Sequence, residues 1–143
     1  MNSRKRLLRW ASGIMIALGV GHLVILTTID WRHVSGWADR GMWAAVPLDL
    51  SGSAVRTAES LQNTVTFWAG LGSFAVPLAL LGGLIWRLAG RGVAVPAWVG
   101  WGLAVWCVFG GVLLVPSPYF VGTLAGLLVV FAARKTERGP APS

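Results

Sequence analysis

Charge is the property that this sequence has least of. Only 12% of its 143 residues are charged and 55% are hydrophobic, whereas a soluble domain carries about 25% charged residues. No charged residue occurs from Thr64 to Trp86 or from Val93 to Ala133. Apolar runs of about 18 residues or more with few or no charges indicate transmembrane helices. The sequence therefore predicts a small integral membrane protein with a single membrane domain, residues 1–143.

Cysteine and recognisable catalytic motifs are also nearly absent. Cys107 is the only cysteine, so no disulfide can form within the chain. The sequence has no GxSxG, no HExxH and no Gly-rich phosphate loop. His22 and His33 lie eleven residues apart, and His33 should lie at or beyond the headgroups, which disfavours a haem. We predict no catalytic residue, no metal site and no cofactor.

Four apolar segments predict an all-α fold, a bundle of four transmembrane helices. The predicted helices are about 7–29, 67–86, 96–115 and 118–133, and a Trp-rich outer loop of about 30–66 joins the first two. A helix of 20 residues rises about 30 Å, which matches the hydrocarbon core of a bilayer. The last two connections are short and contain Gly or Pro, so neighbouring helices should be antiparallel.

Basic residues border the apolar runs and predict how the chain is threaded. Nine of the twelve Lys and Arg residues lie at the N-terminus, near 87–92 and at the C-terminus, with one acid, whereas the outer loop holds three basic residues and four acids. The positive-inside rule then predicts a multi-pass protein of the bacterial inner membrane with both termini cytoplasmic. A DNA-binding face would need the basic residues on one folded surface, so we expect no nucleic acid partner. A cleavable signal peptide also begins with basic residues, but no A-x-A site follows Ile29 directly.

The outer loop is unusual because it contains Trp31, Trp37 and Trp43 within 13 residues. Tryptophan favours the boundary between membrane and water. We expect an amphipathic segment that lies on the outer leaflet and caps the bundle, and a lid over a cavity is the alternative. Residues 53–63 then predict a short polar helix that leads into the second apolar helix.

Small residues recur at intervals of four and predict close helix packing. Gly13, Ala17 and Gly21 form such a stripe on the first helix, and Gly122 and Gly126 form a GxxxG motif on the last. Small residues let two backbones approach closely, which drives helix association in lipid. We expect these stripes to pack within the chain, and a homodimer face, foremost on the last helix, is the alternative.

His22 is the one ionisable side chain deep in the first apolar run. Such groups are costly in lipid unless they face the protein interior, so each is a functional hypothesis. Pro77 removes a helical hydrogen bond to the carbonyl of Ser73, and we predict that His22 packs against this kink. The candidate ligand-binding set is His22, Ser73, Pro77, Cys107 and Trp68. Its role is either a structural hydrogen bond or a contact with a ligand.

Several local patterns together resemble a known family. They are Gly21-His22-Leu23, the GSFAVPL run from Gly72 to Leu78, Gly100-Trp101 and Pro116-Ser117-Pro118. In these patterns the chain resembles a family of small four-helix bacterial membrane proteins, catalogued as a domain of unknown function. More loosely, its layout is similar to that of the DoxX-like four-helix membrane proteins, some of which are linked to quinol oxidation. The resemblance implies a fold and a membrane location but no catalytic residues.

Three functions remain open from the sequence. The first is a structural or partner-binding membrane subunit without enzymatic activity. The alternative is a redox-accessory protein that binds a quinone or another lipophilic ligand in a pocket near His22. A small transporter is a further alternative, weakened because no Asp or Glu lies in any apolar run where it could relay protons. The expected partners are the lipid bilayer and a second membrane subunit, either another copy of the chain or a different protein.

Overall fold

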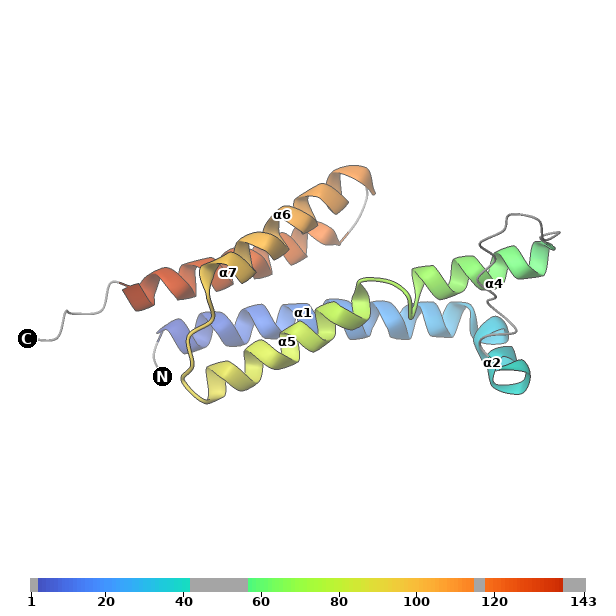
Figure 1. Ribbon diagram of the computed structural model, residues 1–143, viewed down its shortest axis with the longest axis horizontal. Coiled ribbons are helices and arrows are strands. Elements are labelled where there is room, and N and C mark those ends of the chain that lie inside the picture. The colour runs from blue at the N-terminus through green and yellow to red at the C-terminus, as the bar shows by residue number, and fades with distance from the viewer. Residues whose placement is uncertain (1–2, 42–56, 115–117, 138–143) are drawn as a thin grey trace, which may run out of the picture. The chain divides into compact units, whose positions relative to one another are not determined.

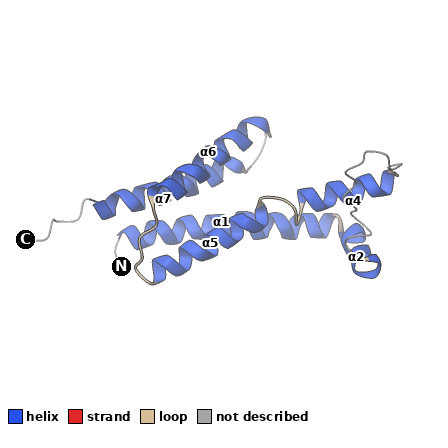
Figure 2. Cartoon of the chain, viewed as in Figure 1, coloured by secondary structure: helices blue, strands red, loops and turns tan. Residues whose placement is uncertain are grey.

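The computed structural model describes residues 3–41, 57–114 and 118–137, and every regular element within these ranges is an α-helix. The helices are α1 (Ser3–Ile29), α2 (Trp31–Arg40), α4 (Ala58–Ala69), α5 (Ala75–Gly90), α6 (Ala97–Leu113) and α7 (Tyr119–Glu137) (Figure 1). Figure 2 shows helices and connecting segments and no strand in the described ranges. The predicted all-α class is therefore confirmed for this part of the chain.

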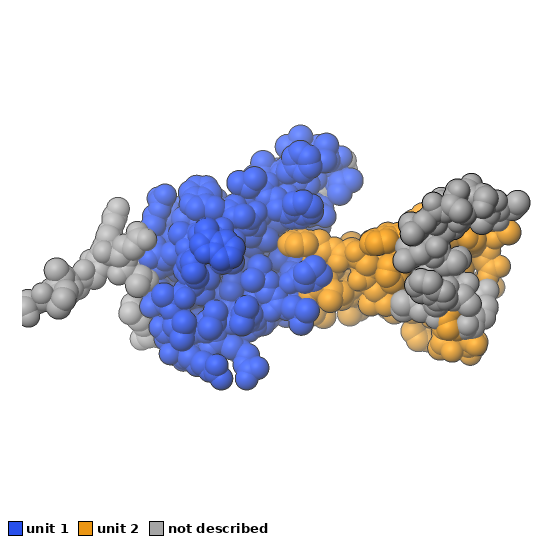
Figure 3. All heavy atoms as spheres, viewed as in Figure 1, with its two compact units in different colours: residues 1–19, 77–143 blue, residues 20–76 orange. Residues whose placement is uncertain are grey.

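The helices fall into two compact units, which are described separately (Figure 3). The first unit comprises residues 1–19 and 77–143, and the second comprises residues 20–76. The first unit thus holds the N-terminal part of α1 together with α6, α7 and nearly all of α5. The second holds the C-terminal part of α1 together with α2 and α4.

Helix α1 begins one turn before the predicted start at residue 7 and ends at the predicted residue, Ile29. Its 27 residues rise about 40 Å, and it is the one described helix that is both long and apolar enough to cross a membrane. Two hydroxyl groups in it bond to the helix itself, Ser12 to the Leu8 carbonyl and Thr28 to the Val24 and Ile25 carbonyls. These bonds allow polar side chains to lie on an apolar helix with their hydrogens satisfied.

The predicted single helix 67–86 is wrong, because the chain breaks between α4 and α5. Helix α4 ends at Ala69, α5 starts at Ala75, and residues 70–74 form turns between them. Gly72 sits under two rings, because a Cβ there would lie 2.8 Å from Phe67 and 2.9 Å from Trp68. The glycines interrupt the helix, and Pro77 then lies in the first turn of α5, where a backbone N–H has no helical partner to lose.

Much of the outer loop predicted at 30–66 is helical. Helix α2 occupies residues 31–40, and α4 takes up the end of the loop from Ala58 onward. The hydroxyl of Thr57 accepts from the Ser60 N–H and caps α4. Trp43 and residues 53–56 of the predicted polar helix lie outside the described residues.

The last two predicted helices are present with shifted ends. The helix predicted at 96–115 is α6, from Ala97 to Leu113, and Pro96 precedes it in an extended conformation. The helix predicted at 118–133 is α7, which runs on to Glu137 and so includes Arg134 and Lys135 in its last turn. Basic side chains there interact favourably with the negative end of the helix dipole.

Within the first unit, α6 and α7 form an antiparallel hairpin (Figure 1). Gly100 lies against Gly126 and Val130, Cys107 lies against Gly122, and Gly110 lies against the ring of Tyr119. Residue numbers rise along α6 while those of their partners fall along α7, which fixes the direction of the pair. The hairpin is packed mainly through small residues of α6, Gly100, Ala104, Cys107 and Gly111, all of which are buried.

The N-terminal part of α1 packs antiparallel to both α5 and α7 in the same unit. A Cβ on Gly82 of α5 would lie 2.9 Å from Met15 and 3.0 Å from the Ser12 carbonyl oxygen. One and two turns toward the N-terminus, the Arg9 guanidinium lies 5.5 Å from the Trp86 ring centre, and Lys5 Nζ donates to the Gly90 carbonyl at 3.5 Å.

The contact with α7 has the same direction, because Lys135 Nζ donates to Ser3 Oγ at 3.2 Å. The basic N-terminal end of α1 and the basic C-terminal ends of α5 and α7 therefore meet at one end of the first unit.

The second unit has its own small core around Trp37. This side chain is buried against Val34 and Phe67, and its Nε1 donates to Asn63 Oδ1 at 3.1 Å. Thr66 Oγ1 donates to Asp30 Oδ2 at 2.9 Å, which gives α4 a second polar contact with the segment before α2. Trp37 is buried because α4 supplies both a ring and a hydrogen-bond acceptor, and the location of this segment at the outer leaflet stays a prediction.

Candidate functional site

His22 forms a hydrogen bond with a backbone carbonyl at the break that follows α4. Its Nε2 lies 2.9 Å from the Ala69 carbonyl oxygen, within the second unit. A carbonyl oxygen can only accept, so Nε2 must carry the hydrogen in this contact. Ala69 is the last residue of α4, and the last carbonyls of a helix have no partner inside it. His22, which lies on α1, thus caps the C-terminal end of α4.

The predicted pairing of His22 with Ser73 is wrong in its partner. The prediction assumes that Pro77 lies inside a helix, where it would leave the carbonyl four residues earlier, that of Ser73, without a donor. The break is instead made at Gly70 and Gly72, so the carbonyl that needs a donor belongs to the end of α4.

Ser73 itself is used locally. Its Oγ donates to the Gly70 carbonyl at 2.6 Å and accepts from the Ala75 N–H at 3.2 Å. It therefore shapes the turn and caps the start of α5.

The remaining candidate ligand residues do not join His22 by the contacts that the structure shows. Trp68 is 56% exposed and meets Phe67 edge to face, with ring centres 5.3 Å apart. Pro77 and Cys107 belong to the first unit, whereas His22, Ser73 and Trp68 belong to the second. A common pocket for these five residues stays a prediction.

Cys107 is buried in the hairpin of α6 and α7. Its side chain is 2% exposed, and a Cβ on Gly122 would lie 2.6 Å from its Sγ. A Cβ on Gly126 would meet the Ala104 N and the Gly100 carbonyl oxygen, both at 2.7 Å. The GxxxG face of α7 is therefore covered by α6 of the same chain.

The stripe predicted on the first helix does not take part in close packing within the described residues. A Cβ on Gly13 or Gly21 would meet nothing within 4 Å, and Ala17 is exposed. The buried face of α1 consists of Leu8, Ala11, Ser12, Met15 and Gly19. The physical reason is that the small residue at the contact with α5 is Gly82, so larger side chains of α1 can lie against it.

The sequence analysis does not predict Gly100 as a helix-packing residue, although its spacing from other small residues of the helix indicates this role. Gly100, Ala104, Cys107 and Gly111 follow at intervals of four, three and four residues, which places them on one face of a helix. A search restricted to intervals of four residues passes over such a face.

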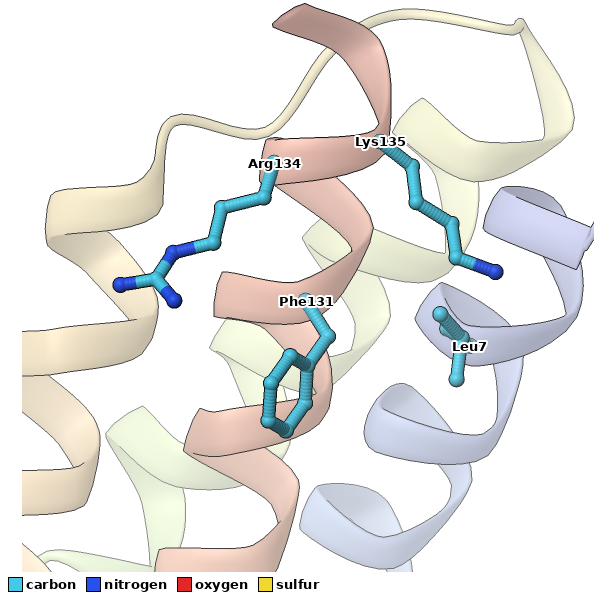
Figure 4. Close-up of a pocket in the computed structure, with 4 residues that line it drawn as sticks. All are labelled: Leu7, Phe131, Arg134 and Lys135. Carbon is cyan, nitrogen blue, oxygen red and sulfur yellow. The ribbon is translucent and has the colours of Figure 1, made fainter. Parts of the chain in front are cut away.

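A pocket at the basic end of the first unit was also missed. Its volume is about 420 Å³, and it is lined by Leu7 of α1 and by Phe131, Arg134 and Lys135 of α7 (Figure 4). In Figure 4 Lys135 extends toward α1, Arg134 extends to the other side of α7, and Phe131 lies one turn away from both. The pocket combines an apolar floor with two cations.

Metal ligands do not gather in the part of the chain that the structure describes. Within residues 3–41, 57–114 and 118–137, no group of three or more His, Cys, Asp or Glu side chains is placed to hold an ion.

Comparison with known proteins places the chain in a family. A family described as "Family of unknown function (DUF6463)" matches residues 6–137, which is most of the chain. No curated protein and no solved structure matches the chain. The predicted resemblance to a domain of unknown function is confirmed in this respect, and the chain belongs to this family of unknown function.

Proposed function

We propose that the chain is a multi-pass integral membrane protein that serves as a structural or partner-binding membrane subunit. In this proposal four segments span the bilayer as one membrane domain: α1, α5 with the turn before it, α6 and α7. Both termini lie on the cytoplasmic side. The observation that carries the proposal is the distribution of large and small side chains around α6.

With the exception of the buried Leu103, helix α6 places small residues inside and large apolar residues outside. Its face toward α7 contains two glycines, an alanine and a cysteine, whereas eight large apolar side chains among its 17 residues are exposed: Trp98, Trp101, Val105, Trp106, Val108, Phe109, Val112 and Leu113. A soluble protein buries its large apolar residues and seldom exposes a continuous apolar patch. Lipid reverses this preference, because association there depends on close backbone contact and large apolar residues face the acyl chains at no cost.

Three of the four proposed spans reach the length that a bilayer of ordinary thickness requires, and α5 is one residue short of it. Helix α1 is long enough by itself, and α6 and α7 have 17 and 19 residues against the 17 to 25 that a span needs. Helix α5 has 16 residues, and Arg87 and Arg91 at its end can extend their charges to the headgroups. The clustering of basic ends of α1, α5 and α7 supports a cytoplasmic location for that end.

His22 has a structural role within this proposal. A carbonyl left without a donor in hydrocarbon costs several kcal/mol, so the bond to Ala69 would allow α4 to end inside or near the membrane. The lipophilic-ligand alternative predicts instead that a quinone or lipid co-purifies with the protein and is lost in His22→Ala.

Cysteine scanning tests the proposed topology directly. Cys107→Ala leaves a chain without cysteine, into which Gln62→Cys on α4 or Arg91→Cys after α5 is introduced, since both positions are exposed. In intact cells an impermeant thiol reagent should label Gln62→Cys and should reach Arg91→Cys only after the membrane is opened. Extraction of the chain by alkaline carbonate, or labelling of both cysteines in intact cells, would refute the proposal.

A further inference from the structure

We propose that the pocket formed by α1 and α7 binds the headgroup of an anionic phospholipid, with the phosphodiester between Arg134 and Lys135 and the upper acyl chain on Phe131 and Leu7. The inference rests on the proposed function, because a bilayer must surround the first unit for a lipid to enter this pocket. It assigns that end of the unit a specific ligand class.

Within the described residues, the cations of the pocket have unused donors. The Lys135 ammonium carries three hydrogens, and the structure commits one of them to Ser3 Oγ at 3.2 Å. The Arg134 guanidinium carries five N–H donors in a planar fork, which is the geometry that binds phosphate oxygens in pairs. Both side chains are exposed, so a ligand can reach them from the surface.

Positive charge predominates in the segments that meet at this end of the first unit. Within the described residues these segments hold eight Lys and Arg residues and one acid, Glu137, the last residue of α7. Arg4, in the first turn of α1, has a buried Nη2 without a hydrogen-bond partner. Basic pockets between membrane helices on the cytoplasmic side are typical sites for anionic headgroups.

The apolar part of the pocket favours a lipid over a soluble phosphate. Phe131 is 51% exposed although it lies one turn from two cations, and Leu7 supplies a second hydrocarbon wall. A free phosphate ion would gain nothing from either side chain. A phospholipid satisfies both halves of the pocket, because its charge and its hydrocarbon are joined at the glycerol.

The binding experiment uses the full chain in micelles of a neutral detergent. Phosphatidylglycerol or phosphatidylcholine with identical acyl chains is added, and bound lipid is counted by native mass spectrometry. In 0.5 M ammonium acetate the screening length is about 4 Å, so diffuse attraction between lipid and protein charge is suppressed.

Two double variants remove the same charge from the same end. Arg134→Gln with Lys135→Gln should lower the preference for phosphatidylglycerol about 25-fold, since one cation near a phosphate contributes about fivefold. The matched control is Arg6→Gln with Arg91→Gln, at two exposed positions outside the pocket, and it should change the preference less than about twofold. Equal losses in both double variants would overturn the site and indicate diffuse charge alone.

A third variant distinguishes the lipid from other phosphates. Phe131→Ala should weaken phosphatidylglycerol binding severalfold and leave any binding of glycerol phosphate unchanged. Displacement of the lipid by glycerol phosphate at equal concentration would overturn the lipid assignment, and so would displacement by a 20-nucleotide single-stranded DNA. Carbonate extraction is measured in parallel. A chain that stays in the membrane but shows no preference for phosphatidylglycerol refutes this inference and leaves the proposed function intact.

Discussion

Replacing Gly100 by alanine should separate α6 from α7, whereas the same change at Gly102 should not. A Cβ at Gly100 would lie 2.6 Å from the Gly126 carbonyl oxygen and 2.9 Å from the Val130 backbone nitrogen. Both contacts are to backbone, so a side-chain rotation cannot relieve them. Two residues away on the same helix, a Cβ at Gly102 would meet nothing within 4 Å.

The pair of variants isolates the cost of the clash. An ordinary Cβ contact begins near 3.4 Å, so the helices must move apart by the difference from 2.6 Å, about 0.8 Å. Overpacking of this kind costs about 1–3 kcal/mol. Both variants gain the same benefit of alanine over glycine in a helix, about 1 kcal/mol, so that benefit cancels in the comparison.

Cys107 supplies the assay without an added label. It is the only cysteine of the chain, it is 2% exposed, and it faces Gly122 in the same helix pair. A maleimide can modify it only when the pair opens, so the rate of modification reports the opening equilibrium. Because 1.4 kcal/mol corresponds to a factor of ten, Gly100→Ala should react about 5- to 150-fold faster than Gly102→Ala.

The control is the rate in strong denaturing detergent, where all variants should react alike. Equal rates for Gly100→Ala and Gly102→Ala in mild detergent would refute the packing argument. A slower reaction in Gly100→Ala would refute it as well, because it would mean that the added methyl group tightens the pair.

Three further predictions concern single contacts. Gly122→Ala should destabilise the hairpin by about 1–3 kcal/mol through its clash with Cys107 Sγ, and Cys107→Ala should relieve part of that loss in the double variant; additive shifts in thermal unfolding would contradict the contact. Asn63→Leu should leave Trp37 Nε1 without an acceptor, which costs about 1–3 kcal/mol, and should speed hydrogen exchange in α4. The control Gln62→Leu, at the exposed neighbouring position, should not speed that exchange. Unchanged exchange in Asn63→Leu would count against a shared core of α2 and α4. His22→Ala should speed hydrogen exchange at the end of α4 and leave α6 and α7 unchanged, and a loss of bound chromophore or quinone in that variant would contradict a purely structural role.

Much of the secondary structure was predictable because its signals are local. Helix α1, α6 and α7 follow from apolar length and from the prolines and charges at their ends, with errors of a few residues. The predicted helix 67–86 misses the break before α5, because it treats Pro77 as a kink within one helix. The local composition contained the correct signal, since Gly70 and Gly72 stand just before a proline that suits a first helical turn.

The candidate site was less predictable, because its contacts join segments far apart in the chain. The rule that a carbonyl near a helix break needs a donor was sound, and His22 does supply one. The rule could not choose between Ser73 and Ala69, because that choice depends on where the helix stops and on how α1 is rotated. Likewise Gly13 and Gly122 carry similar sequence signals, yet only Gly122 meets another helix within the described residues.

Apolar length, helix-breaking residues and the grouping of basic residues are properties of neighbours along the chain, and the sequence by itself determined them. It therefore indicated which segments are helical, which of them are apolar enough to suit lipid, and which ends carry positive charge. The tertiary structure alone decided that the basic ends of α1 and α7 meet at one pocket, that Gly100 faces Gly126, and that His22 bonds to a carbonyl 47 residues away. Such contacts depend on the rotation and register of one helix against another, and a shift of a single residue turns a side chain about 100° around its helix.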